Sequence, residues 1–161
     1  MESRIKFVGH PLHPMMIAFP LGLLGTAAIF DLIYMASSNA GWTQAAFYMI
    51  VAGCVSGLLA AVPGALDWWN IPRRTRAKRI GLWHGIGNVV VLALFFASWL
   101  MRYPDPAAPP MRALALGFVG LGTALVTGWL GGELVDRLGV GVDEGANLDA
   151  PNSLTGQPAR R

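Results

Sequence analysis

Four long apolar runs, at residues 15–36, 44–66, 81–101 and 111–132, limit what this chain can fold into. Each run holds about 20 residues, which is the helical length needed to cross a hydrocarbon core of about 30 Å. Only 13% of the residues are charged, against roughly 25% in a typical soluble domain. Inside lipid the backbone must satisfy its own hydrogen bonds, so each run is expected to be an α-helix. With short connections, the sequence predicts an all-α integral membrane protein, a four-helix up-down-up-down bundle over residues 1–142.

The basic residues predict how this bundle is oriented in the membrane. Ten of them fall on one side, namely Arg4, Lys6, Arg73, Arg74, Arg76, Lys78, Arg79, Arg137, Arg160 and Arg161. The other side carries only Arg102 and Arg112. Because cytoplasmic loops are enriched in Lys and Arg, both termini are expected in the cytoplasm. Residues 143–161 are polar, with Gly and Pro, and are expected to form a flexible cytoplasmic tail.

The same topology gathers polar residues at the end that carries the termini. Three histidines and two carboxylates are placed there: His10, His13, His84, Asp67 and Glu133. Asn88 lies one helical turn from His84 and should share its face. Ionisable groups at membrane depth are costly and usually face the bundle interior or water, so these side chains are candidates for one shared site.

A weak internal repeat accompanies this arrangement. Histidines lie near the starts of the first and third runs, while Gly64-Ala-Leu-Asp67 and Gly131-Gly-Glu133 close the second and fourth. A duplicated helical hairpin would produce such a pattern.

The opening motif, His10-Pro11-Leu12-His13-Pro14, leaves a geometric question open. Both histidines precede proline, which disfavours the α conformation for each of them. In an extended polyproline II segment they would lie about 9 Å apart along the axis and could not share one metal. In a β-turn the ends of the motif would come within about 7 Å and could serve one centre.

Three interpretations of the polar residues follow from their chemistry. In the first, His84 and His13 are the axial ligands of a b-type haem, with His10 as substitute for His13 and Asn88 beside the site. Arg79 and its basic neighbours would pair with the propionates, and four tryptophans would line the pocket, namely Trp68, Trp69, Trp83 and Trp129. In the second, the histidines with Asp67 and Glu133 bind zinc or iron. In the third, no cofactor is bound, and the polar groups pair with arginines, cap helices and line the headgroup zone.

Other residues bear on the class of protein and on its partners. Cys54 is the lone cysteine, so a disulfide or a CxxC motif is excluded. Asp31, near the far end of the first run, is expected to form a salt bridge with Arg102 or Arg112. The basic run at 73–79 suits anionic lipid and is too short and too close to the membrane for nucleic acid. No motif assigns an enzymatic reaction.

Four segments also carry a family resemblance: HPLHPMMIAFPLG, GALDW, RRTRAKRIGLWH and GWLGGELV. Together they resemble the uncharacterised bacterial four-helix membrane family marked by an N-terminal His-Pro-x-His-Pro motif and catalogued as a domain of unknown function. The resemblance covers about residues 5–142. Some members are joined to Rieske-type iron–sulfur domains, which implies electron transfer. The family resemblance also implies which residues occupy the motif positions, namely His10, His13, Asp67, His84 and Glu133.

We therefore expect a membrane electron-transfer or b-type haem-binding subunit, with its site near the cytoplasmic face. This chain has no Rieske ligands and no CxxCH haem-attachment motif, so a redox partner would be a separate protein. The alternatives are a non-haem metal-binding membrane protein, or a structural subunit of a larger membrane complex without cofactor. In every case the lipid bilayer is a partner, and homo-oligomers are compatible with the sequence.

Overall fold

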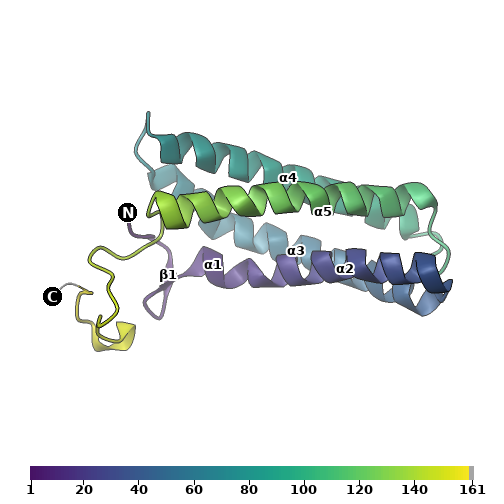
Figure 1. The fold of residues 1–161 in the computed structure, drawn as a ribbon, viewed down its shortest axis with the longest axis horizontal. Helices are drawn as coiled ribbons and strands as arrows, with labels where there is room; N and C mark the ends of the chain where they lie inside the picture. Colours follow the sequence, from purple (N-terminus) through teal and green to yellow (C-terminus); the bar gives the residue numbers. More distant parts are fainter. Residues whose placement is uncertain (160–161) are drawn as a thin grey trace.

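A computed structural model describes residues 1–159 as four long helices with a small N-terminal hairpin and an irregular tail. Arg160 and Arg161, counted above on the basic side, lie outside the described residues. The hairpin pairs β1 (Lys6–Phe7) with β2 (His10–Pro11) in antiparallel register. Figure 1 shows both ends of the chain at the same end of the bundle, which we call the terminus end.

The first membrane helix is built from two pieces, α1 (Leu12–Met16) and α2 (Ala18–Ser37), which together make one apolar span. Pro20 has no amide hydrogen to donate to the carbonyl four residues earlier, which accounts for the break beside Ile17. A left-handed Ser38, with φ of +55°, ends α2. The helix α3 (Ala40–Asn70) then begins at Asn39, whose side chain accepts a hydrogen bond from the amide of Gly41.

The second half repeats this plan. Thr75 caps the start of α4 (Arg76–Arg102) by accepting a hydrogen bond from the amide of Lys78. A proline-rich loop leads to α5 (Met111–Gly132), which continues as one π-helical turn, η1 (Glu133–Arg137). A single 3₁₀ turn, η2 (Ser153–Thr155), lies in the tail.

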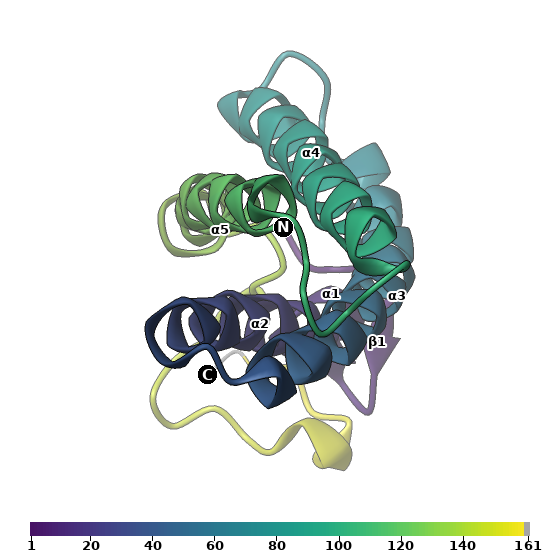
Figure 2. The same cartoon turned by 90° about the vertical axis from the view of Figure 1, so that its right-hand side faces the viewer.

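Two antiparallel hairpins make up the bundle, α2 with α3 and α4 with α5, as the end-on view in Figure 2 shows. They meet mainly through α3 and α4 and less through α2 and α5. A central apolar cluster joins them, formed by Leu24, Ala27, Ala46, Ile50, Cys54, Val91 and Phe95. Large apolar side chains also cover the outward faces; Leu58, Val62 and Leu125 are each at least 60% exposed. Four helices are long and apolar enough to cross a membrane, so these faces suit lipid contact.

A buried ion pair closes the end opposite the termini. Both guanidinium Nη atoms of Arg102 bind the carboxylate of Asp31, at 2.7 and 2.6 Å, and neither residue is more than 1% exposed. Arg102 also donates to the hydroxyls of Ser98 and Thr43, at 3.2 and 3.3 Å. Ser98 in turn donates to the carbonyl of Ala113 at 2.7 Å. The salt bridge expected for Asp31 is confirmed with Arg102, and together with the hydroxyls of Thr43 and Ser98 it connects all four spans.

Candidate functional site

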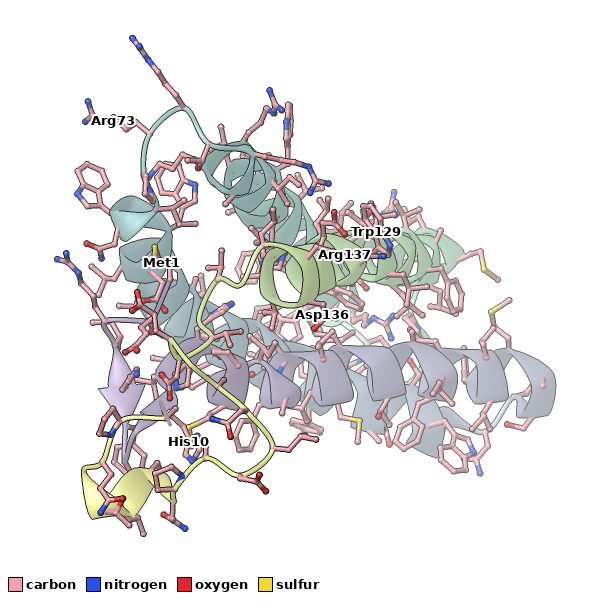
Figure 3. The ribbon with its side chains drawn as sticks, turned by 60° about the vertical axis from the view of Figure 1, so that its left-hand side comes forward. Met1, His10, Arg73, Trp129, Asp136 and Arg137 are labelled. Carbon is pink, nitrogen blue, oxygen red and sulfur yellow. The ribbon has the colours of Figure 1, made fainter. Side chains whose placement is uncertain are left out.

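The two histidines of the opening motif belong to different elements. His10 lies in β2 and is exposed, with its Nε2 3.4 Å from the hydroxyl of Ser153 in the tail; Figure 3 shows it beside this tail. His13 lies in helix α1, and its carbonyl accepts the amide of Ile17 at 3.1 Å. The expectation that His13 avoids the α conformation is therefore wrong. Pro14 falls in the first helical turn, where an amide hydrogen would have no helical partner, so the proline is tolerated there.

Ion pairs hold the hairpin against the tail. The ammonium of Lys6 donates hydrogen bonds to carboxylates of Asp143 and Glu2. These bonds, that to Asp143 first, raise the pKa of Lys6 above its ordinary value. The hydrogen bond from Lys6 correspondingly lowers the pKa of Glu2. His10 thus belongs to a surface contact between the hairpin and the tail.

His13 instead meets His84 between the two helical hairpins. Their ring centroids lie 6.4 Å apart and the ring planes are nearly perpendicular, at 89°. The Nδ1 atom of His13 lies 2.8 Å from the carbonyl oxygen of Ala60 on α3. On α4, the Nδ1 atom of His84 lies 2.8 Å from the carbonyl oxygen of Thr127 on α5. A carbonyl oxygen only accepts, so each Nδ1 carries the hydrogen of its contact, and in the neutral form of such a ring the lone pair lies on Nε2.

A glycine makes room for each ring. A Cβ atom on Gly64 would lie 2.8 Å from Nδ1 of His13, and one on Gly131 would lie 3.1 Å from Cε1 of His84. Each glycine follows the carbonyl that receives the imidazole by four residues, one helical turn along the same face. Both helical hairpins thus contain the same arrangement of an imidazole, a backbone carbonyl and a glycine four residues later. This similarity agrees with the weak internal repeat of the sequence.

A polar network continues from His84. The amide of Asn88 donates to the carbonyl of His84 at 2.9 Å and lies 3.2 Å from its Nε2. The hydroxyl of Thr127 contacts the side-chain oxygen of Asn88 at 3.1 Å. Asn88 therefore shares the face of His84, as its spacing predicts. Thr127 and Ala60, which hold the rings through backbone carbonyls, were not among the candidates, since every residue offers such a carbonyl.

The remaining candidates have partners of their own. Asp67 accepts from the hydroxyl of Ser3 at 2.6 Å and from the amide of Arg4 at 3.1 Å. Glu133 pairs with Arg76 across α4 and η1. Within residues 1–159, no three or more His, Cys, Asp or Glu side chains form a group that could hold a metal ion. His10, Asp67 and Glu133 are thus not gathered around the His13–His84 pair.

Three of the four tryptophans expected to line a haem pocket are exposed. Trp69, Trp83 and Trp129 are 73%, 59% and 66% exposed. Side chains so exposed near the end of membrane helices are typical of the aromatic belt at a membrane interface. Arg79 is also placed apart from the histidines, in a cavity beside the loop between α3 and α4.

These features define a multi-span helical membrane protein with a paired-histidine site between two similar hairpins. The chain belongs to the family described as "Predicted membrane protein (DUF2231)", whose model matches residues 9–144. Comparisons with curated proteins and with solved structures find no match.

Proposed function

We propose that His13 and His84 are the two protein ligands of a b-type haem, and that the protein is an electron-transfer subunit of a membrane system. The observation that carries the proposal is the pairing of two imidazoles, each with its Nδ1 fixed by a backbone carbonyl. Histidines that bind metals nearly always donate their other ring N–H to a carbonyl or carboxylate in this way. A haem held by these two histidines would supply one-electron redox chemistry.

The number of ligands favours haem over zinc. A zinc site takes three or four protein ligands, whereas haem needs two axial ones at most. The spacing is also suitable, since imidazoles that share one metal at about 2.0–2.1 Å have ring centres roughly 6 Å apart. The observed ring separation is 6.4 Å. Asn88 lies against Nε2 of His84, so its amide must turn away when that nitrogen becomes a ligand.

An absorption spectrum of the detergent-purified protein after haem addition tests this proposal. We expect a Soret band from haem held by two imidazoles, and its loss in His13→Ala and in His84→Ala. His10→Ala is the matched control, since His10 lies on the hairpin surface, and it should keep the band. A wild-type protein without the band, or a band that survives both substitutions, would contradict the haem assignment.

Elemental analysis of the same samples distinguishes a non-haem metal centre from a haem. Stoichiometric zinc or iron without a Soret band, lost in His84→Ala and kept in His10→Ala, would support a non-haem centre at the same pair. Such a centre would need ligands beyond the two histidines, from the substrate, from water or from a second protein.

The proposed setting is a bacterial inner membrane with both termini in the cytoplasm. Supporting it are the eight basic residues within 1–159 that lie on the terminus side, Arg4, Lys6, Arg73, Arg74, Arg76, Lys78, Arg79 and Arg137. A separate redox protein would then reach the histidine pair from the cytoplasmic side.

A further inference from the structure

A cavity lies at the terminus end, between the end of α3 and the start of α4. The cavity measures about 310 Å³, and its lining includes Trp68, Arg74, Arg76, Lys78, Arg79 and Leu82. Four of these residues are cationic, and the tryptophan and leucine add an apolar wall. None of the three histidines lines it.

Its apolar wall is fixed in place. The indole N–H of Trp68 donates to the carbonyl of Lys78 at 3.0 Å. The ammonium of Lys78 donates to the carbonyl of Trp68 at 2.7 Å and lies 3.9 Å from the centre of the indole ring. A Cβ atom at Gly81 would come within 2.7 Å of the Trp68 ring, so glycine there lets the ring lie against α4. The indole is thus a built part of the cavity.

The cations of the cavity differ in what they already bind. Lys78 is bound to the carbonyls of Trp68 and Trp69, and Arg76 is paired with Glu133. Within residues 1–159, the side chains of Arg74 and Arg79 form neither a salt bridge nor a hydrogen bond. Arg74 and Arg79 therefore line the same cavity, and no carboxylate of the described residues pairs with their charges.

The backbone of Arg74 is unusual. Its φ is +64°, a left-handed conformation that costs a non-glycine residue roughly 1–2 kcal/mol. Glycine fills five of the eight positive-φ positions within residues 1–159. At position 74 the chain instead carries a cationic side chain that lines the cavity.

The location of the cavity indicates its ligand. One apolar span ends at Asn70 and the next begins at Arg76, so the cavity lies at the level of the lipid headgroups. Figure 3 shows Arg73 projecting outward from the same loop. Guanidinium groups bind phosphate oxygens in bidentate fashion, and basic clusters beside membrane helices attract anionic lipids.

We propose that this cavity binds an anionic phosphate group, held by Arg74 and Arg79. Two sources share that chemistry, the headgroup of an anionic phospholipid and free inorganic phosphate. The wall of Trp68 and Leu82 offers apolar contact that a phospholipid uses and inorganic phosphate does not, which favours the lipid. The site is separate from the histidine pair and does not depend on haem binding.

Native mass spectrometry of the full-length protein in detergent tests the proposal, with phosphatidylglycerol and phosphatidylcholine added in turn. We expect one phosphatidylglycerol molecule to be retained in preference to phosphatidylcholine. Each substitution, Arg74→Gly or Arg79→Gln, should weaken this retention about fivefold, from roughly 1 kcal/mol per juxtamembrane charge. Arg74→Gly is especially informative, because glycine suits the left-handed backbone, so lost binding cannot be attributed to misfolding.

Arg112→Gln is the matched control, since it removes an exposed arginine from the opposite end of the bundle. It should retain phosphatidylglycerol like the wild type. A parallel titration with inorganic phosphate separates the two sources. If millimolar phosphate displaces the lipid, the site is assigned to free phosphate. If the lipid stays bound, the site is assigned to the headgroup. Equal retention of both lipids, or unchanged retention in both cavity variants, would overturn the proposal.

Discussion

Glycine at two positions determines whether the paired histidines can keep their places. Gly64→Ala would bring a Cβ atom to 2.8 Å from the ring of His13, which the hydrogen bond to Ala60 holds in position. At Gly131 the corresponding atom would lie 3.1 Å from His84, so a smaller shift relieves the contact. Because overpacking costs about 1–3 kcal/mol, we expect Gly64→Ala to lower the free energy of unfolding in detergent by that amount and Gly131→Ala by less.

Gly128→Ala supplies the comparison for this prediction. It lies on α5 near Gly131, and a Cβ atom there would meet nothing within 4 Å. Alanine should therefore be neutral, or stabilise the helix by up to about 1 kcal/mol. If Gly64→Ala proves as stable as Gly128→Ala, the packing of His13 against Gly64 is not as the structure places it.

The sequence predicts the level at which the site residues lie along the bundle, but not which of them point toward one another. Topology alone places His13 and His84 at the same end of the bundle, because the first and third helices start there. It fixes the level of Asp67 and Glu133 in the same way, but not the direction in which each points around its helix. Ser3 and Arg76 take those two carboxylates. Ser3 lies in the segment before the helices and Arg76 is the first residue of α4, outside the apolar runs, where no hydropathy pattern reports direction.

At the scale of the elements, the buried pair of Asp31 and Arg102, with the two hydroxyls bonded to Arg102, joins all four spans. In Asp31→Leu, Arg102 would remain buried without its carboxylate, and breaking such a pair costs about 3–5 kcal/mol. We expect a loss of that size in the free energy of unfolding, measured by denaturant titration in detergent. Arg112→Met removes an exposed arginine of α5 and should change stability by no more than about 0.5 kcal/mol.

The double variant, Asp31→Leu with Arg102→Met, shows what kind of contribution the pair makes. Replacing both members of a buried pair with apolar residues of similar size is often neutral or stabilising, so the double variant should recover most of the lost stability. A double variant as unstable as Asp31→Leu alone would instead mean that the hydrogen bonds from Arg102 to Ser98 and Thr43 hold the helices together.

The helices themselves were predictable in number and kind, and less so at their ends. Apolar runs mark the segments inside lipid, so four runs gave four helices. The structure extends the second from the expected 44–66 to Ala40–Asn70 and starts the third at Arg76 instead of residue 81. Near the headgroups a helix no longer needs apolar side chains. Its ends there are set by caps such as Asn39 and Thr75, which hydropathy does not detect.

At the scale of the whole molecule, the distribution of charge is more one-sided than a count of basic residues suggests. Arg102 is buried and neutralised by Asp31, so Arg112 is the basic residue left exposed at the end opposite the termini. The terminus end carries both chain ends and the basic loop between α3 and α4 (Figure 1). The positive-inside rule therefore predicts that the terminus end faces the cytoplasm.

Cysteine labelling in intact cells checks this orientation. The single native cysteine, Cys54, is buried and can be replaced by alanine to give a cysteine-free background. In that background, Ala108→Cys lies at an exposed position of the loop before α5, and Leu148→Cys replaces a fully exposed side chain of the tail. We expect a membrane-impermeant thiol reagent to label Ala108→Cys in intact cells, and Leu148→Cys only after the membrane is opened. The reverse pattern would place the histidine pair and the arginine cavity on the outer side, away from any cytoplasmic redox partner.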